Sequence, residues 1–383
     1  MRLLVLGGGL MGRAAASDMT RQPDVEKVLV ADVDPACLEA TEKLVDSEKL
    51  ETIELNVGEV SDVAAVMEGV DAALGAVSYT YNVELANAAI DAGIHYCDLG
   101  GNNSVVDGEL ALDAKAKERG VTVIPDTGLA PGMVSLLAMH GVEAMDEAED
   151  VHIRVGGLPV DPRPPLDYMI VFSVQGLINE YVEPCLAIRQ GRTVGDLKPL
   201  TEVESISFPD PFKNLEAFHT SGGASTLPRT LLGTVRNLDY KTIRYPGHAA
   251  KMRAMYRLGL MSRDPVDVDG VTVQPRSVLE RLLALNLPRS GRDVVLLRVT
   301  VTGTRDGRDM LATYEMVDYG EPDRGITAMM RDTAYPSAVI CMMMARGETK
   351  PGASPQELAV DGARFIEELK RRGLPLDVRL ETR

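Results

Sequence analysis

The chain has 383 residues, and 40 Lys or Arg against 57 Asp or Glu give it a formal net charge of −17, which disfavours nucleic acid as a partner. Its 45% hydrophobic and 25% charged residues are typical of a globular protein and exclude a mainly disordered or fibrous chain. No apolar run is long enough to span a membrane, and four cysteines without a CxxC pair fit a reducing compartment, so we expect a cytoplasmic protein.

The first third of the chain alternates short apolar runs with amphipathic stretches, the pattern of a βαβ series. The predicted strands are Arg2–Leu6, Lys27–Ala31, Thr52–Asn56, Asp71–Ala76, Ile94–Leu99 and Val121–Ile124. The helices predicted between them are Leu10–Thr20, Pro35–Lys43, Ser61–Glu68, Asn82–Ala92 and Glu109–Arg119. This order predicts an α/β fold with a Rossmann-type doubly wound parallel sheet.

The pattern changes near residue 127, where glycine and proline residues follow the last of these strands. A helix is predicted over Met133–Met145, followed by strands at Val151–Gly157, Met169–Ser173, Thr234–Tyr245, Val294–Thr304 and Leu311–Asp318. These predict a second α+β domain with a mixed or antiparallel sheet. Two helices, Thr333–Arg346 and Pro355–Arg372, end the sequence. We therefore expect one domain over residues 1–127, completed by C-terminal helices in 332–383, and a second over 128–331.

A glycine motif, Gly7-Gly8-Gly9-Leu10-Met11-Gly12, stands between the first strand and the first helix. In such a motif Gly7 permits the turn, Gly9 lets a pyrophosphate approach the backbone, and Gly12 allows close helix–strand packing. Asp32 ends the second strand, where a carboxylate accepts hydrogen bonds from the adenosine ribose and repels a 2′-phosphate. The alternative is a glycine turn that only packs, with Asp32 as a surface residue. The context favours a site for NAD.

Further cofactor contacts are predicted where the strands end, because ligands of doubly wound sheets bind at the carboxyl ends of the strands. These positions are Leu10, Met11, Val33, Asn56, Val57, Val77, Ser78, Leu99 and Gly100. The five histidines show no spacing typical of zinc ligands, so no metal is predicted.

Basic and aromatic residues gather between Lys241 and Lys251. Arg244 is suited to a carboxylate, and His248 to a general base because its ordinary pKa lies near neutrality. A structural role, solvated or paired with the backbone, is the alternative for both. Upstream, Arg229 follows a loop rich in hydroxyl side chains that either lines a pocket or forms turns.

Four segments together resemble the saccharopine dehydrogenase-like family. They are the glycine motif, Asp126-Thr127-Gly128-Leu129-Ala130-Pro131-Gly132-Met133, Gly156-Gly157-Leu158-Pro159 and Ile243-Arg244-Tyr245-Pro246-Gly247-His248. The resemblance is closest to the lysine 6-dehydrogenases of that family. It implies a Rossmann-like domain completed by C-terminal helices, an α+β domain with substrate and dimer contacts, and amine oxidation by NAD. Ala130 stands where the saccharopine-forming members have a substrate-contacting aspartate.

From this resemblance we expect oxidative deamination of the side-chain amine of L-lysine to the 6-semialdehyde, which cyclises to 1-piperideine-6-carboxylate, by a homodimer. A base must take the ammonium proton; the candidates are His248, Asp98 and Asp126, and His248 has the most suitable ordinary pKa. Substrate contacts are expected from Arg244, Tyr245, Tyr79 and Arg229. The alternatives are a saccharopine- or carboxynorspermidine-type dehydrogenase and a non-catalytic NAD sensor.

Overall fold

The computed structural model describes residues 1–382. Its first sheet has seven parallel strands in the order β3-β2-β1-β4-β5-β6-β17. They are β1 (Arg2–Leu6), β2 (Lys27–Asp32), β3 (Leu50–Glu54), β4 (Ala72–Gly75), β5 (His95–Asp98), β6 (Thr122–Ile124) and β17 (Gly352–Ala353). The strand order reverses direction between β1 and β4, which confirms the predicted doubly wound sheet.

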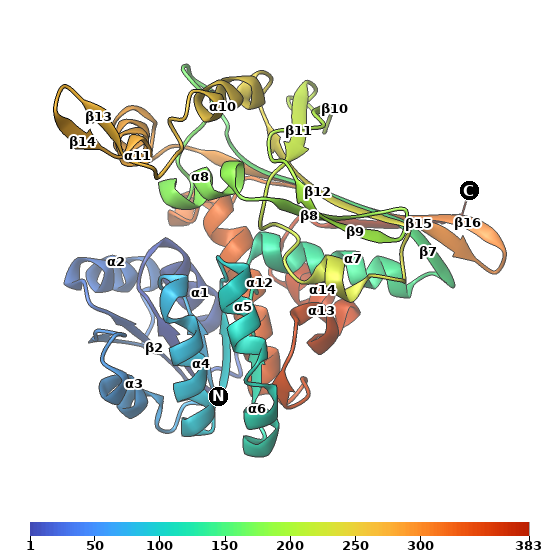
Figure 1. The fold of residues 1–383 in the computed structure, drawn as a ribbon. Helices are drawn as coiled ribbons and strands as arrows, with labels where there is room; N and C mark the ends of the chain where they lie inside the picture. The colour runs from blue at the N-terminus through green and yellow to red at the C-terminus, as the bar shows by residue number, and fades with distance from the viewer. Residues whose placement is uncertain (383) are drawn as a thin grey trace.

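Helices cover this sheet on both faces (Figure 1). Those before residue 127 are α1 (Leu10–Thr20), α2 (Pro35–Val45), α3 (Val60–Met67), α4 (Asn82–Ala92), α5 (Asn103–Leu110) and α6 (Asp113–Arg119), and α12 (Ala328–Ala345) packs on β4 and β5. The prediction of one helix over Glu109–Arg119 is wrong at its first residues, because α5 ends at Leu110 and α6 begins at Asp113. Asn102 caps the earlier one by accepting hydrogen bonds from the N–H groups of Ser104 and Val105.

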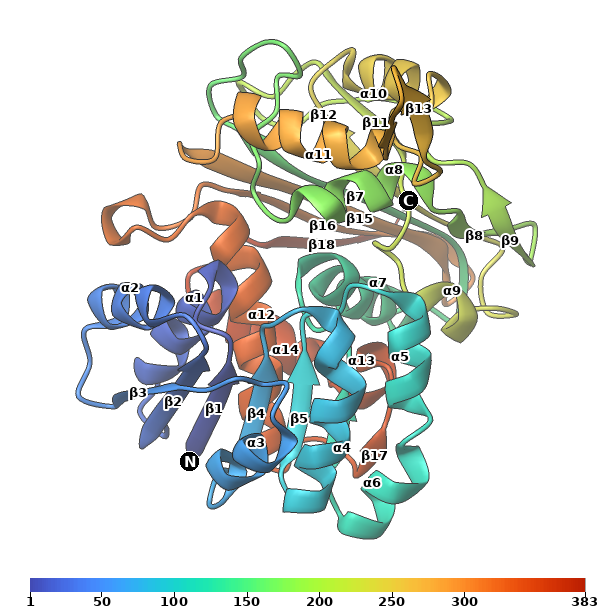
Figure 2. The same cartoon turned by 60° about the vertical axis from the view of Figure 1, so that its left-hand side comes forward.

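The second sheet is mixed and lies across one end of the first domain (Figure 2). Its longest strands are β7 (Glu147–Pro159), β15 (Asp293–Arg305) and β16 (Arg308–Asp318), and β12 (Asn237–Arg244) pairs parallel to β7. The remaining strands are β8 (Cys185–Arg189), β9 (Arg192–Leu197), β10 (Glu204–Ile206), β11 (Leu215–His219) and β18 (Asp377–Thr382), with a separate hairpin of β13 (Val266–Val268) and β14 (Val271–Val273). The predicted α+β domain with a mixed sheet is confirmed.

Four helices belong to this second layer: α8 (Val174–Val182), α9 (Leu227–Thr230), α10 (His248–Arg257) and α11 (Pro275–Asn286). The strand predicted over Met169–Ser173 is wrong. Its apolar side chains are buried against α8 and α11 instead of in a sheet. A short apolar run does not distinguish burial by helices from burial in a sheet.

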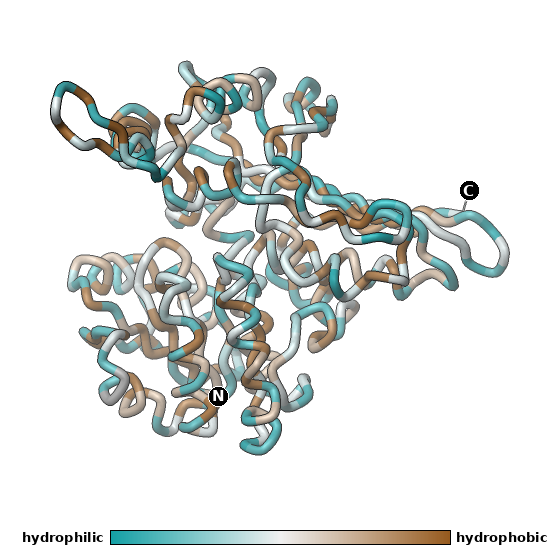
Figure 3. Tube along the Cα trace, in the orientation of Figure 1, coloured by the Kyte–Doolittle hydropathy of each residue, from teal (hydrophilic) through white to brown (hydrophobic). Residues whose placement is uncertain are grey.

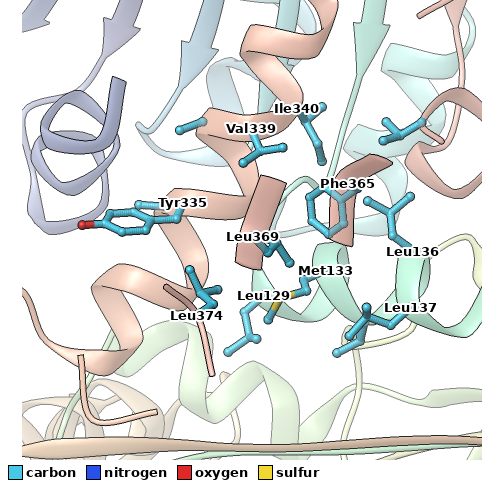
Figure 4. Close-up of a cluster of buried hydrophobic side chains, with 14 of the residues drawn as sticks. Leu129, Met133, Leu136, Leu137, Tyr335, Val339, Ile340, Phe365, Leu369 and Leu374 are labelled. Atoms are coloured by element: carbon cyan, nitrogen blue, oxygen red, sulfur yellow. The ribbon is translucent and has the colours of Figure 1, made fainter. Parts of the chain in front are cut away.

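The two layers share one hydrophobic core (Figure 4). It is built from α7 (Val134–Glu143), α12 (Ala328–Ala345) and α14 (Gly362–Arg371), with α13 (Gln356–Ala359) nearby. Phe365 and Leu369 of α14 face Leu136 of α7 and Val339 of α12. Hydrophobic segments run through this interior, whereas the turn between β15 and β16 is hydrophilic (Figure 3).

The C-terminal segment contributes to both layers. Helix α12 packs on α1, β17 extends the first sheet beside β6, and β18 extends the second beside β16. We propose domain boundaries close to residues 127 and 328, with 377–382 returning to the second domain. Short turns complete the fold at η1 (Tyr79–Tyr81), η2 (Leu129–Met133) and η3 (Pro322–Arg324).

Candidate functional site

A cleft of about 800 Å³ separates the carboxyl edge of the first sheet from the second domain. The sheet register aligns Leu6 of β1 with Gly75 of β4, and Gly75 with Asp98 of β5, so the loops after these strands leave at one edge. Those loops form one wall of the cleft: Gly9–Met11, Ala76–Tyr79, Leu99–Asn103 and Gly128–Pro131, with Asp126. The other wall comes from α8, the loop at 221–223 and the end of β12.

The glycine loop fits a phosphate group. A Cβ on Gly12 would stand 1.7 Å from the carbonyl oxygen of Gly7, and a Cβ on Gly7 would stand 2.5 Å from that of Ala76. At Gly9, by contrast, a Cβ would meet nothing within 4 Å, because this residue faces the open cleft. No side chain caps the start of α1, so its first N–H groups are free for an anion.

Asp32 lies beside this loop at the end of β2. Its Oδ2 accepts a hydrogen bond of 2.6 Å from the N–H of Gly8, and its Oδ1 accepts one of 2.8 Å from the N–H of Asp34. Because each carboxylate oxygen can accept more than one hydrogen bond, both remain able to accept from ribose hydroxyls. The loop, the helix and the carboxylate together fit the pyrophosphate and ribose of a dinucleotide.

Asp126 contributes a carboxyl group to the cleft wall on the sheet side. Its Oδ2 accepts a hydrogen bond from the hydroxyl of Ser225, and its Oδ1 is buried without a hydrogen-bond partner among residues 1–382. Burial raises the pKa of Asp126 to about 7, and the charge of Asp98 adds to this rise. Its backbone lies in the left-handed region at φ 61°, a conformation found at functional sites in non-glycine residues. Asp126 is therefore suited to exchange a proton near neutral pH.

Asp98 lies deeper, behind this wall. It is fully buried, and its Oδ1 accepts a 2.6 Å hydrogen bond from the N–H of Gly100. Burial raises the pKa of the Asp98 carboxyl, and burial with the charge of Asp98 raises the pKa of Glu109. Asp98 does not line the cleft. Its position supports an influence on Asp126 and not direct contact with a substrate.

Arg244 stands on the opposite wall and is held by its surroundings. Its Nε donates to the hydroxyl of Tyr181 at 3.3 Å, its Nη1 donates to the carbonyl of Ile243 at 2.9 Å, and its guanidinium lies 5.0 Å from the centre of the Tyr168 ring. Nη2 lies 3.7 Å from Oε2 of Glu180, which also lines the cleft. Burial raises the pKa of Glu180 to about 7, while the charge of Arg244 opposes this rise.

Two consecutive segments of the chain match two models of one family. Residues 3–124 match the saccharopine dehydrogenase NADP binding domain, and residues 128–374 match the saccharopine dehydrogenase C-terminal domain. The chain belongs to the saccharopine dehydrogenase family. The resemblance expected from the sequence motifs is confirmed at the level of the family, and together with the glycine loop it assigns a nicotinamide dinucleotide to the cleft.

Two relatives are identical to this chain at about a quarter of the aligned positions. The mitochondrial alpha-aminoadipic semialdehyde synthase of Rattus norvegicus is 23% identical over 275 residues, which are 69% of this chain and 29% of the rat protein. The L-glutamate-forming, NADP(+) saccharopine dehydrogenase of Pyricularia oryzae is 24% identical over 268 residues, 68% of this chain and 58% of that protein. The chain thus spans less than a third of the rat relative's length.

Two solved structures share the fold of this family member. The apo saccharopine dehydrogenase (L-Glu forming) of Saccharomyces cerevisiae has a TM-score of 0.80 at 19% identity, covering 99% of each chain. The homospermidine synthase of Legionella pneumophila, in complex with NAD, has a TM-score of 0.69 at 13% identity, covering 100% of this chain and 91% of that one.

The structure brings ten of the predicted site residues to the cleft wall: Gly9, Leu10, Met11, Val77, Ser78, Tyr79, Leu99, Gly100, Asp126 and Arg244. Gly7 and Gly12 shape the glycine loop from behind. Val33, the residue that follows Asp32, is 61% exposed. Asn56 and Val57 lie in the turn after β3, where the side chain of Asn56 accepts a hydrogen bond from the N–H of Gly58, and their contact with adenine stays a prediction.

Besides Asp98, three predicted substrate or catalytic residues lie away from the cleft wall. Arg229 forms an exposed ion pair with Asp107, and the hydroxyl of Tyr245 donates to the carbonyl of Pro159 at 2.8 Å. His248 is 1% exposed. We therefore propose Asp126, in place of His248, as the base.

His248 completes a chain of hydrogen bonds behind Arg244. Its Nε2 lies 3.0 Å from the hydroxyl of Tyr181, and its Nδ1 lies 3.0 Å from the carbonyl of Leu166. A neutral ring satisfies both partners by donating from Nδ1 and accepting at Nε2. Burial and the charge of Arg244 lower the pKa of His248 to about 3. The ring thus holds Tyr181, and through it Arg244, in place.

A buried neutral histidine predicts a specific pH dependence of stability. Below pH 6.5 the unfolded chain gains a proton at His248 that the folded chain does not, so the folded state loses about 2 kcal/mol from this residue by pH 5. We expect His248→Asn to be less stable than the wild type at pH 7.5, and this difference to narrow at pH 5. Urea unfolding of the wild type and the variant at both pH values measures this difference in stability. A stability difference that stays constant or widens at pH 5 contradicts a neutral His248 ring.

The sequence did not indicate the residues that surround Arg244, which lie on α8 or precede that helix. Glu180 and Tyr181 belong to α8, and Tyr168 precedes it. The sequence carries a signal for this helix, because Ser173 caps it by accepting from the N–H of Gly176 and apolar side chains follow at helical spacing. The pairing of Glu180 with Arg244 depends on long-range packing and has no local signal.

Proposed function

We propose that this chain is a nicotinamide-dinucleotide-dependent dehydrogenase that oxidises a carbon–nitrogen bond, with NAD as cofactor and the side-chain amine of L-lysine as substrate. One observation carries the proposal: Asp126, a buried carboxyl of near-neutral pKa, shares a cleft with the glycine loop on its own side and with Arg244 on the other.

Residues on the two walls of the cleft have different roles in the reaction. When bound, the nicotinamide ring supplies the acceptor for a hydride. Asp126 removes a proton from the substrate ammonium, because only the neutral amine has the lone pair that assists departure of hydride from the neighbouring carbon. Water then hydrolyses the substrate imine to the 6-semialdehyde and ammonia. Arg244 binds the substrate carboxylate at the other end of the cleft.

Ala130 supports L-lysine over saccharopine. This residue lines the cleft four positions after Asp126 and offers only a methyl group, with no charge or hydrogen-bonding atom for a larger substrate's polar groups. A saccharopine-type reaction is the second candidate, favoured by the names of the relatives. A non-catalytic sensor of NAD is a third, and it predicts binding without turnover.

A panel of amines separates these functions. We expect NADH and ammonia to form from NAD and L-lysine alone. NADH formation that requires saccharopine, or consumption of NADH that requires lysine with a keto acid, supports the second candidate. Calorimetric binding of NAD without turnover of any amine supports the sensor. The predicted homodimer and cytoplasmic location stay predictions; no helix within residues 1–382 has the length and apolarity to cross a membrane.

Asp32 predicts a preference for NAD over NADP. The carboxylate of Asp32 lies beside the glycine loop, where the ribose 2′-position is expected, and like charge opposes a 2′-phosphate. We expect kcat/KM to favour NAD by roughly 10-fold or more, and Asp32→Ser to reduce that preference. Steady-state rates with both cofactors measure it. Equal use of both cofactors by the wild type contradicts the role of Asp32.

A further inference from the structure

We propose that Glu180 and Arg244 together bind the α-ammonium and α-carboxylate of an amino acid, so that the substrate is an α-amino acid carrying a second, reacting amine. This inference rests on the proposed function and extends it, because neither the family match nor the glycine loop assigns a role to Glu180.

The first support is that the facing atoms of the pair are incompletely bonded. Nε and Nη1 of Arg244 are used by Tyr181 and Ile243, whereas Nη2 makes no hydrogen bond within residues 1–382. Oε2 of Glu180 is buried and also lacks a hydrogen-bond partner there. Their separation of 3.7 Å is too long for a hydrogen bond. A ligand that supplies one anionic and one cationic group satisfies both.

The second support is the rigid placement of the pair. Arg244 is fixed by Tyr181 and by the ring of Tyr168, and Tyr181 in turn is fixed by His248. Glu180 lies on the same helix as Tyr181, one residue earlier. Both charged groups are therefore presented to the cleft by buried neighbours, as a specific recognition site requires.

The third support is the position of the pair relative to Asp126. The N–H of Ser221 donates to the backbone carbonyl of Glu180 at 3.0 Å, and the hydroxyl of Ser225 donates to the Asp126 carboxylate. These serines are the two ends of one five-residue loop, which spans at most about 14 Å. The loop therefore holds both acids in one region of the cleft, and the proposal requires that the side-chain amine of the bound amino acid reach Asp126.

The charges define the substrate class. A diamine or polyamine can donate to Oε2 of Glu180 but leaves Nη2 of Arg244 without a hydrogen-bond acceptor, and an amino-carboxylate without an α-amine leaves that Oε2 without a donor. A buried charged group that lacks a hydrogen-bond partner is costly, so each group missing from the ligand weakens binding. A basic α-amino acid supplies every partner.

Three ligands test the inference on the full chain saturated with NADH, using calorimetry so that no turnover is needed. They are L-lysine, 6-aminohexanoate, which lacks the α-amine, and 1,5-diaminopentane, which lacks the carboxylate. We expect the wild type to bind L-lysine roughly 10- to 100-fold more tightly than either analogue. In the Glu180→Gln variant, the affinity for L-lysine should fall to that for 6-aminohexanoate. The affinity for 6-aminohexanoate itself should change by less than about 3-fold.

The matched control is Glu147→Gln, which removes the same charge from an exposed residue at the start of β7 and should change no affinity. Equal binding of L-lysine and 6-aminohexanoate by the wild type overturns the inference, as does a Glu180→Gln variant that weakens both ligands equally or neither. Because binding is measured without catalysis, discrimination among the ligands combined with absent lysine oxidation would contradict the proposed reaction and leave the recognition site standing.

Discussion

Replacing Asp126 with asparagine is expected to lower kcat/KM for amine oxidation by about 100- to 10,000-fold, the range for loss of a general base. The amide cannot accept the ammonium proton, but it keeps the size of the side chain and an oxygen for the hydroxyl of Ser225. In the wild type, kcat/KM should rise with pH through about 7, because burial raises the pKa of Asp126 to that value and the base acts only when deprotonated.

Steady-state rates from pH 6 to 9 measure this prediction, and titration with NADH checks that the variant still binds the dinucleotide. Asp309→Asn, at an exposed residue of β16, is the matched control and should behave as the wild type. A variant Asp126→Asn with normal kcat/KM, or one that keeps the rise near pH 7 at reduced rate, contradicts the assignment of the base.

Gly12→Ala is expected to abolish measurable dinucleotide binding. Its Cβ would stand 1.7 Å from the carbonyl oxygen of Gly7, so the loop that faces the cofactor must move. Since Gly12 is also buried in α1, we expect a loss of about 1–3 kcal/mol in the free energy of unfolding, the usual cost of overpacking. Calorimetry with NADH and urea unfolding measure the two effects.

Gly195→Ala is the matched control for this change. Gly195 lies in β9, where a Cβ would come no closer than 3.8 Å to another atom, and we expect unchanged NADH affinity. Full NADH binding by Gly12→Ala would show that the glycine loop does not hold the cofactor.

The first domain could be predicted from sequence because its signals are local. Apolar strands, helix periodicity and the glycine motif placed β1, α1 and α4 at the bounds the structure has. The loop residues at the carboxyl ends of β1, β4 and β5 followed from the rule for ligand sites in doubly wound sheets, and they line the cleft. These features need no knowledge of distant contacts.

The second domain was harder because its elements are defined by pairing between distant segments. Strands β8–β11 were not predicted, and the apolar run at Met169–Ser173 was assigned to a sheet although helices bury it. His248 has a suitable ordinary pKa, but only its burial beside Arg244 shows that it stays neutral. Conversely, Asp126 has an unsuitable ordinary pKa that burial raises to about 7.

The most direct test of the proposed reaction follows the hydride itself. L-lysine carrying two deuterium atoms on C6 is mixed with NAD and the full chain, and the reduced cofactor is analysed by mass spectrometry and NMR. The account predicts reduced cofactor with one deuterium at C4 of the nicotinamide, together with an equal amount of ammonia. Binding of NAD and lysine with no reduced cofactor, or reduced cofactor without deuterium, would contradict it.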